Sequence, residues 1–127
     1  MITDYFAHRE EMDYPNFSRM LEDAAGRYPG NTALRMRNGS GAFEELSYGE
    51  FDRRVRALSS FMETEGIEKG DRVGLISENR FEWVISYYAA VTGAVLIVPF
   101  DIHGDVEALV SYAAFAELRG IFFSSNY

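Results

Sequence analysis

Two short polar segments hold most of the residues whose types and spacing could carry chemistry. Ser77-Glu78-Asn79-Arg80 places a carboxylate two residues from a guanidinium, a combination that can bind a polar ligand. His103 stands between Asp101 and Asp105, and an imidazole with acidic neighbours can bind a metal ion or transfer a proton. In both segments we favour the structural interpretation, in which Asn79 and Asp105 cap helices and the charged side chains are exposed.

Three other groups have a chemical and a structural interpretation, and we favour the structural one for each. Gly39-Ser40-Gly41 is the only G-x-G string, and we expect a tight turn there rather than a phosphate-binding loop. Ser124-Ser125 lacks the helix start and the partner base that a serine nucleophile needs. Trp83 and the pair Tyr87-Tyr88 are expected to form the core and flank of a helix rather than a stacking platform for a base.

No known catalytic motif is present along the chain. The sequence contains no G-x-G-x-x-G dinucleotide turn, no G-x-x-x-x-G-K-S/T phosphate loop and no G-x-S-x-G nucleophile elbow. His8 is far from His103 in the sequence, so the two histidines form no motif together. The residues alone therefore predict no catalytic constellation.

Composition narrows the class of protein. The chain has 127 residues, enough for one domain with a core, and 47% of them are apolar. The absence of cysteine excludes disulfides, thiolate zinc sites, iron–sulfur clusters and a cysteine nucleophile, which fits a reducing cytoplasm. A net charge of −8 disfavours nucleic acid as a partner, because its phosphates are also negative. The start of the chain has no basic and apolar run typical of a signal peptide.

The apolar pattern alternates between helical spacing and short strand-like runs. Asn16 is placed to cap a first helix, and Ser47 with Glu50 forms an S-x-x-E capping box before a second. The expected segments, in order, are an arm (1–15) that includes the acidic stretch from Arg9 to Asp13, a helix from Phe17 to Tyr28, hairpin strands 33–37 and 43–46, a helix between Ser47 and Gly66, a strand 72–76, a helix between Asn79 and Gly93, a strand 94–98, a helix after Asp105, and a strand 120–123.

The order of these segments predicts an α/β fold. Helices alternate with strands after the hairpin, which is typical of parallel strands joined by right-handed crossovers. We therefore expect an N-terminal β-hairpin followed by a mostly parallel sheet with helical crossovers. The uncharged run from Trp83 to Phe100 is interpreted as a buried helix, a glycine cap and a buried strand, and no transmembrane segment is expected. Ligands of such sheets bind at the carboxyl ends of the strands, so the loops of interest are 77–80, 99–104 and 124–127.

Six blocks occur in this order along the chain: Phe17–Leu34, Leu46–Leu58, Gly66–Trp83, Ala89–Val95, Val98-Pro99 and Phe122–Ser124. In content and order, these blocks resemble AMP-forming acyl-CoA synthetases, the adenylate-forming family that also includes luciferases and peptide-synthetase adenylation domains. The S-E-N-R-x-E-W string, Ser77 to Trp83, is most similar to fatty acyl-CoA ligases. After Val98-Pro99 the sequence departs from the family, since Phe100 to Gly104 replaces a proline-containing loop. The resemblance covers about residues 16–124.

The resemblance implies the beginning of a longer ligase, with residues 16–127 forming the N-terminal α/β part of its large domain. The implied parent reaction adenylates a fatty acid with ATP and Mg²⁺ and then transfers the acyl group to CoA. The family binds ATP with a Ser/Thr/Gly-rich loop ending in Pro-Lys, which would come after the last strand here. No catalytic, cofactor-binding or metal-binding residue is therefore assigned within the 127 residues, and we expect this chain alone to be inactive, without bound cofactor and prone to self-association.

Two alternatives remain open at this point. The chain is then either a stand-alone α/β binding or interaction module without catalysis, or part of an adenylation domain that serves a carrier protein. The acyl-chain length and the oligomeric state have no signal in the sequence.

Overall fold

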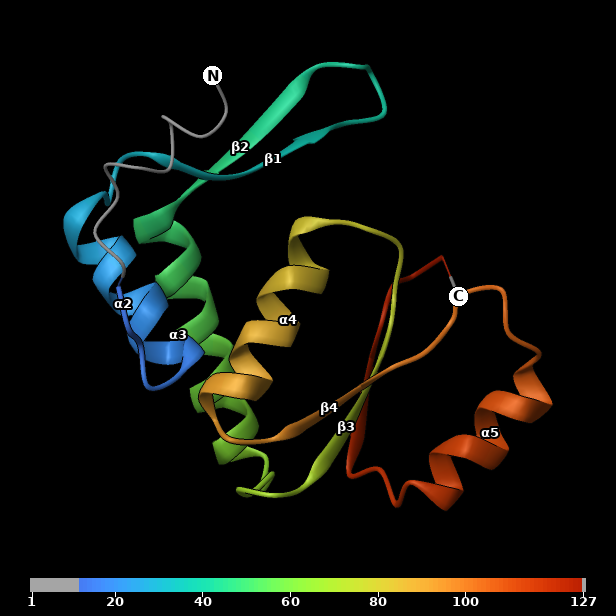
Figure 1. Cartoon of the computed structure of the whole chain (residues 1–127). Helices are drawn as coiled ribbons and strands as arrows, with labels where there is room; N and C mark the ends of the chain where they lie inside the picture. Colours follow the sequence, from blue (N-terminus) through green and yellow to red (C-terminus); the bar gives the residue numbers. More distant parts are fainter. Residues whose placement is uncertain (1–11, 127) are drawn as a thin grey trace.

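The computed structural model describes residues 12–126, which form two helices and a hairpin followed by a parallel sheet with helical crossovers (Figure 1). Residues 1–11, which include His8 and most of the expected arm, and Tyr127 lie outside the described residues. The elements are α2 (Phe17–Arg27), β1 (Thr32–Arg37), β2 (Phe43–Ser47), α3 (Tyr48–Thr64), β3 (Arg72–Ile76), α4 (Phe81–Thr92), β4 (Leu96–Pro99), α5 (Val106–Phe115) and β5 (Gly120–Phe123).

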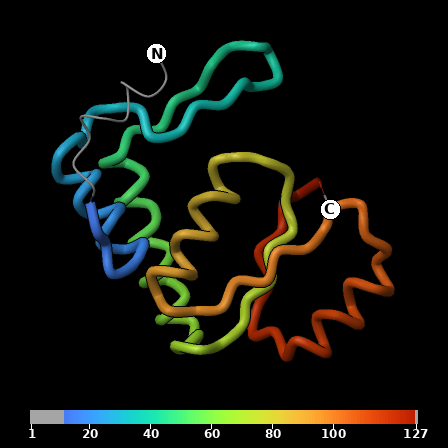
Figure 2. The backbone as a smooth tube through the Cα atoms, viewed as in Figure 1, coloured from blue at the N-terminus to red at the C-terminus, as the bar shows by residue number. Residues whose placement is uncertain are grey.

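The hairpin forms where its turn residues predict it. β1 pairs antiparallel with β2, and the Asn38 side-chain carbonyl accepts hydrogen bonds from the backbone N–H groups of Ser40 and Ala42. Gly41 adopts a φ of 82°, which favours glycine at that position. The Gly39-Ser40-Gly41 string is therefore a turn, as expected. The tube in Figure 2 shows this hairpin extending away from the parallel sheet.

Side-chain capping bonds form at the starts of α2 and α3, as expected, but not at the starts of α4 and α5. Asn16 accepts from the N–H of Arg19, and Ser47 accepts from the N–H of Glu50, as N-caps do. The Glu50 carboxylate, however, accepts hydrogen bonds from two arginines of its own helix, so the reciprocal half of the expected capping box does not form. Competition from guanidinium donors within one turn explains this difference.

Asn79 is not the cap of α4, which corrects the sequence-based expectation. The N-cap is Arg80, and it makes no side-chain capping hydrogen bond. The Arg80 guanidinium binds the carboxylate of Glu82 instead, with Nε 2.7 Å from Oε2. Asp105 is the N-cap of α5 as expected, but its side chain also makes no capping bond.

The second sheet is parallel, as predicted, and its strand order is β4-β3-β5. β3 is central, so the connection through α5 carries the chain across it from one edge to the other. In Figure 1, α4 lies on one face of this sheet and α5 on the opposite face. Side chains alternate accordingly, because Val73 and Leu75 are buried on the α4 side whereas Gly74 and Ile76 face α5.

The core lies between the sheet and the helices α2, α3 and α4. Phe51 and Val55 of α3 pack in one cluster with Ile85 and Ala89 of α4 and with Val73 of β3. The uncharged run from Trp83 to Phe100 thus becomes α4, a turn and β4. Within residues 12–126, no helix is both long and apolar enough to cross a bilayer.

β4 begins at Leu96 rather than at Ala94, because Gly93 and Ala94 form the turn that follows α4. Gly93 is the C-cap with a φ of −77°, and the positive φ of 55° falls on Ala94. A Cβ at Gly93 would lie 3.1 Å from the Ser59 hydroxyl oxygen, so this glycine permits the close approach of α3. Alanine in the left-handed region costs free energy that glycine does not.

Replacing Ala94 by glycine is therefore expected to raise the free energy of unfolding by about 0.5–1 kcal/mol, after the entropy of the unfolded glycine is subtracted. The control is Ala57→Gly, the same chemical change at an exposed position inside α3, which should lower stability by about 1 kcal/mol. Urea unfolding of both variants measures the difference. Two variants destabilised alike would contradict the strain at Ala94.

Candidate functional site

The carboxyl ends of β3 and β5 carry a cluster of polar side chains that comes from two distant parts of the sequence. Glu78 follows β3, whereas Ser124 and Asn126 follow β5, and the parallel pairing of the two strands brings them together. The Glu78 Oε1 atom accepts hydrogen bonds from Ser124 Oγ at 3.1 Å and from Asn126 Nδ2 at 2.9 Å. Arg80 Nη1 lies 3.3 Å from the same oxygen. One carboxylate oxygen therefore binds donors from both loops.

Strand order explains why the cluster forms at this place. In a sheet ordered β4-β3-β5, the chain leaves β3 toward one edge and reaches β5 at the other. Such a point, where neighbouring strands connect in different directions, is where parallel α/β sheets leave a crevice for ligands. Two of the three loops singled out from the sequence, 77–80 and 124–126, meet here.

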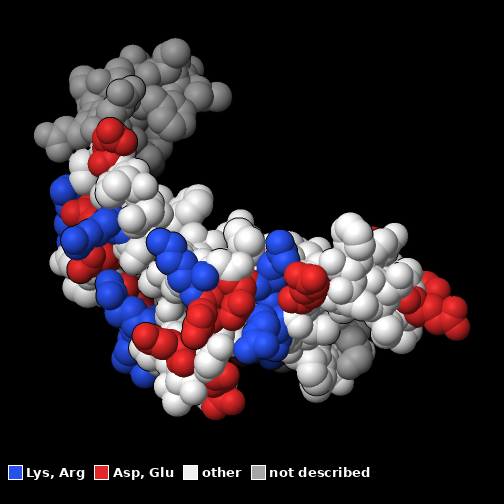
Figure 3. Space-filling model, turned by 90° about the horizontal axis from the view of Figure 1, so that it is seen from below, with Lys and Arg blue, Asp and Glu red and all other residues white. Residues whose placement is uncertain are grey.

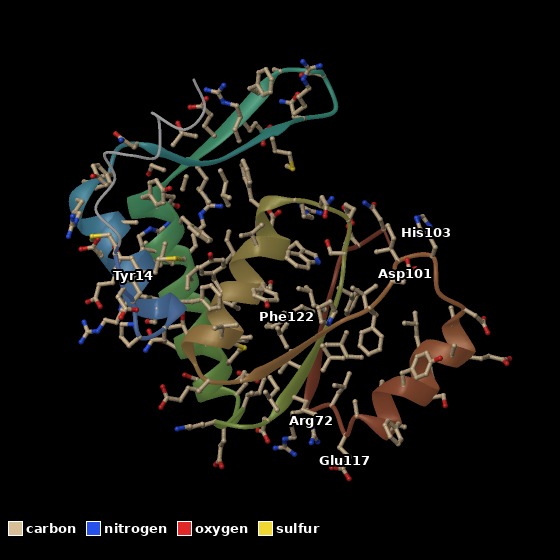
Figure 4. The ribbon with its side chains drawn as sticks, in the orientation of Figure 1. Tyr14, Arg72, Asp101, His103, Glu117 and Phe122 are labelled. Atoms are coloured by element: carbon tan, nitrogen blue, oxygen red, sulfur yellow. The ribbon has the colours of Figure 1, made fainter. Side chains whose placement is uncertain are left out.

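The cluster borders a hollow of about 450 Å³ on the α4 side of the sheet. Ser77 and Arg80 line it from the end of β3, Trp83 from α4, and Phe122 and Ser124 from β5. Figure 4 shows Phe122 on β5 pointing toward the side of α4. The hollow combines one guanidinium, the carboxylate of Glu82 and several hydroxyls with aromatic walls, and ligand pockets commonly pair a few polar groups with apolar walls.

The electrostatics of the cluster stabilise the ionised form of Glu78. A hydrogen bond from its own backbone N–H, together with those from Ser124 and Asn126, holds the pKa of Glu78 below its ordinary value of 4.5, while desolvation opposes this. The hydrogen bond from Arg80 likewise lowers the pKa of Glu82. The guanidinium is thus shared between two carboxylates, and the group as a whole carries one net negative charge.

The remaining candidates from the sequence do not join this cluster. His103 is exposed, and its backbone N–H donates to Asp101 Oδ1 at 2.9 Å, which makes a local turn. Figure 4 shows both residues in the loop between β4 and α5, with Arg72 and Glu117 at the opposite end of the sheet. Among residues 12–126, no group of three or more His, Asp or Glu side chains is arranged to hold a metal ion.

The aromatic candidates are largely structural, as expected. Tyr88 packs edge-on against Phe51 with ring centroids 5.2 Å apart, which places it beside the core. Trp83 stacks on Tyr87 at 5.5 Å with an interplanar angle of 11°. Trp83 also lines the hollow, so one edge of this pair remains available to a ligand.

The cluster can bind and orient, but the described residues do not form a nucleophile–base pair. The Ser124 hydroxyl is buried and donates to a carboxylate whose other donors keep it ionised, so it is held in place rather than activated. Sequence reasoning did not foresee that Glu78 binds Ser124 or that Asn126 takes part. The available signal was topological, because only the order of the strands makes these loops neighbours.

Removing one donor is expected to change the titration of Glu78. Ser124→Ala deletes a hydrogen bond to the ionised form, so the pKa of Glu78 should rise toward its ordinary value. Because the pKa is lowered on folding, the stabilisation from Glu78 is present above about pH 4.5 and is lost as the pH falls through the lowered pKa. NMR titration of the carboxyl group in Ser124→Ala, with the exposed neighbour Ser125→Ala as the control, tests this. Identical titrations in the two variants would contradict the assigned bond.

Comparison with known proteins identifies the family. The family model for the AMP-binding enzyme matches residues 21–126. The chain belongs to the AMP-binding enzyme family. This confirms the resemblance seen in the sequence, and the match spans every helix and strand from β1 to β5 as well as most of α2.

Individual relatives match this AMP-binding chain over only part of their own length. The crotonobetaine/carnitine–CoA ligase of Salmonella typhimurium is 28% identical over 86 residues, which are 68% of this chain and 17% of the ligase. The chain therefore spans about a sixth of the curated relatives it matches.

Solved structures share the fold at lower identity. The N-terminal subdomain of Klebsiella oxytoca NpsA aligns with a TM-score of 0.76 and 18% identity over 88% of this chain and 28% of that one. A Mycobacterium tuberculosis fatty acyl CoA synthetase aligns with a TM-score of 0.74 and 20% identity over 87% of this chain and 21% of that one. The expected α/β fold class is thereby confirmed.

Proposed function

We propose that this chain is the N-terminal α/β part of an AMP-forming fatty acyl-CoA ligase, with residues 1–15 as an arm and 16–127 as the first structural unit. The match of the AMP-binding family to residues 21–126 is the observation that carries the proposal. The S-E-N-R-x-E-W string from Ser77 to Trp83 supports the fatty acyl type, and this string forms the loop and helix start beside the hollow.

The proposed parent reaction has two steps. A fatty acid carboxylate oxygen attacks the α-phosphorus of ATP, and the bond to pyrophosphate breaks, which gives an acyl-adenylate. The thiol of CoA then loses its proton and attacks the acyl carbonyl carbon, and AMP leaves with the electrons of the carbon–oxygen bond. Mg²⁺, when bound, neutralises charge on the phosphates. We place ATP, Mg²⁺ and CoA binding in other parts of the complete protein, and the assignment of no catalytic residue to this chain stays a prediction.

The contribution of this chain is to position neighbouring structure. Glu78 ties the segment after β5 to the end of β3, and buried Ser124 donates a backbone N–H to the carbonyl of Ile76 at 3.0 Å. The polypeptide that follows β5 therefore leaves the sheet in a defined direction. We further propose a cytoplasmic location for the parent enzyme, on the basis of the cysteine-free composition of these 127 residues.

The isolated 127-residue chain is expected to form no acyl-adenylate, whereas the protein encoded by the complete reading frame should do so with fatty acids. ATP–pyrophosphate exchange with a series of carboxylic acids, from acetate to palmitate, measures the first step in both proteins. A matched reaction without carboxylate gives the background. Exchange above that background by the isolated chain would contradict its assignment as a non-catalytic part.

A second candidate is an adenylation domain that serves a carrier protein. The observation in its favour is the similarity in fold to the N-terminal subdomain of Klebsiella oxytoca NpsA. Release of acyl-CoA upon addition of CoA supports the ligase, and acyl transfer only to a carrier protein supports this alternative. A reading frame without downstream ligase sequence would favour the stand-alone binding module.

A further inference from the structure

The turn between β1 and β2 holds an asparagine amide by hydrogen bonds at both of its ends. The Asn38 Oδ1 atom accepts three of them, from the backbone N–H of Ser40 at 3.1 Å, from the Ser40 hydroxyl at 2.7 Å and from the backbone N–H of Ala42 at 3.0 Å. The Nδ2 atom donates to Glu44 Oε1 at 3.0 Å. The amide group is therefore fixed in one orientation.

The next residue, Gly39, offers a backbone nitrogen beside this amide. The hydrogen bond from the Ser40 N–H to Oδ1 closes a small ring that runs through Gly39, so the ring holds Asn38 Cγ close to the Gly39 nitrogen. Gly39 is exposed, and its N–H donates no hydrogen bond to any of residues 12–126. This nitrogen is therefore free to lose its proton to solvent.

The three donors at Oδ1 favour attack on the amide carbon. When a nucleophile adds to a carbonyl carbon, negative charge develops on the oxygen, and fixed donors about 2.7–3.1 Å away stabilise that charge. The donors from Ser40 and Ala42 lie at such distances. A side chain at position 39 would crowd the attacking nitrogen, and glycine has none. The turn thus combines a positioned nucleophile, a polarised carbonyl and open access.

We propose that Asn38 is a covalent modification site, at which the hairpin turn promotes spontaneous deamidation to aspartate and isoaspartate. The Gly39 nitrogen loses its proton to solvent and attacks Asn38 Cγ, so that a new nitrogen–carbon bond forms. The bond between Cγ and Nδ2 then breaks, and Nδ2 leaves as ammonia with the electrons of that bond and a proton from water. The product is a cyclic imide that contains the Gly39 nitrogen.

Water completes the reaction. It adds to one of the two imide carbonyl carbons, and the carbon–nitrogen bond at that carbon breaks. Opening at the side-chain carbonyl gives aspartate, whereas opening at the main-chain carbonyl gives isoaspartate, whose main chain runs through the former side chain. Overall, water replaces ammonia without any oxidation or reduction. The chain becomes one unit more negative than its formal charge of −8.

The new carboxylate lies beside a negative charge. Figure 3 shows acidic and basic side chains close together on one face of the molecule, where opposite charges offset one another. At the turn, the donor from Asn38 to Glu44 is lost and two carboxylates face each other, which is destabilising. The hairpin arginines are engaged elsewhere, because Arg35 pairs with Glu45 and Arg37 lies over an aromatic ring at 5.0 Å. Modification is therefore expected to loosen this end of the hairpin.

Peptide mapping by mass spectrometry tests the proposal. Trypsin releases Asn38 in the peptide 38–53, where it is the only asparagine, and Asn31 in the peptide 28–35. Asn31 is the internal control, because it is exposed but is followed by the branched Thr32. At neutral pH, the folded protein should deamidate at least about tenfold faster at Asn38 than at Asn31. Asn38 should also react severalfold faster in the folded protein than in the same protein unfolded by urea.

Two variants separate the contributions of the turn. Ser40→Ala removes the hydroxyl donor but keeps the backbone N–H, so it is expected to slow the reaction about tenfold in the folded protein and to leave the rate in urea unchanged. Gly39→Ala should slow the reaction in both states. A Cβ at Gly39 would meet nothing within 4 Å, so the turn accepts this change. Ser125→Ala, at an exposed serine outside the turn, is the matched control.

The two comparisons with the unfolded protein and with Ser40→Ala decide the proposal. If Asn38 deamidates in the folded protein no faster than in urea, the turn does not promote the reaction and the proposal is overturned. Equal rates for Ser40→Ala and Ser125→Ala in the folded state would overturn it as well. The exchange of ammonia for water is read from the peptide mass, and chromatography separates aspartate from isoaspartate. None of these measurements depends on ligase activity, so the proposed function is tested separately.

Discussion

Replacing Phe51 by alanine is expected to lower the free energy of unfolding by about 3–5 kcal/mol. The side chain is 4% exposed and packs at the centre of the cluster formed by α2, α3 and α4. Its removal leaves a cavity and also removes the edge-on contact with Tyr88. Since small domains are stable by only about 5–15 kcal/mol, this one change removes a large share of the total.

Phe61 provides the matched control for Phe51. It lies on the same helix, α3, but is 55% exposed. Phe61→Ala should therefore change the free energy of unfolding by less than about 1 kcal/mol. Urea denaturation of the two variants compares the same chemical change in two environments. Equal losses would show that α3 does not bury the face assigned to it.

Replacing Gly74 by valine is expected to be comparably destabilising, although it adds atoms rather than removing them. A Cβ at this position would lie 2.9 Å from Leu118 Cδ1 and 3.0 Å from Phe100 Cε2. Gly74 is in the central strand, so the backbone cannot move away without disturbing both neighbours. Overpacking of this kind costs about 1–3 kcal/mol, and the branched valine should fall at or above the upper end of that range.

Gly74→Ala and Gly26→Ala form the control pair for this prediction. Gly26 lies in α2, and a Cβ there would meet nothing within 4 Å. Alanine at Gly26 should stabilise the helix by about 0.5–1 kcal/mol, whereas alanine at Gly74 should destabilise the sheet. Thermal unfolding reports both effects, and stabilisation by Gly74→Ala would contradict the close packing of Leu118, which lies between α5 and β5, against β3.

The type and order of the elements were predictable because their signals are local. The alternation of apolar runs with helical spacing requires no knowledge of distant residues, and Ser47 and Asn16 mark helix starts by their own side chains. The α/β class followed from the order of helices and strands. The expected N-cap of α4 was wrong, because two neighbouring polar residues could begin this helix. The N-cap is Arg80 rather than Asn79.

The site was predictable only as a set of loops. The rule that ligands bind at the carboxyl ends of parallel strands selected the loops 77–80, 99–104 and 124–127, but it cannot say which of these loops touch. That depends on the strand order, which places β5 rather than β4 beside the loop that carries Glu78. The left-handed backbone at Ala94 was also missed, because Gly93 offered a simpler end for the helix.

The central position of β3 has a consequence for how the protein is made. A ribosome synthesises β3 and its neighbour β4 first, while the strand that covers the other side of β3 comes only after α5. At ordinary rates of translation, this interval lasts on the order of seconds. During that time β3, which contains Val73 and Leu75, has one unpaired edge. The hydrogen bond between Ser124 and Glu78 has not yet formed. The bare edge of β3 is therefore open to unwanted strand pairing after β4 has emerged and before β5 has.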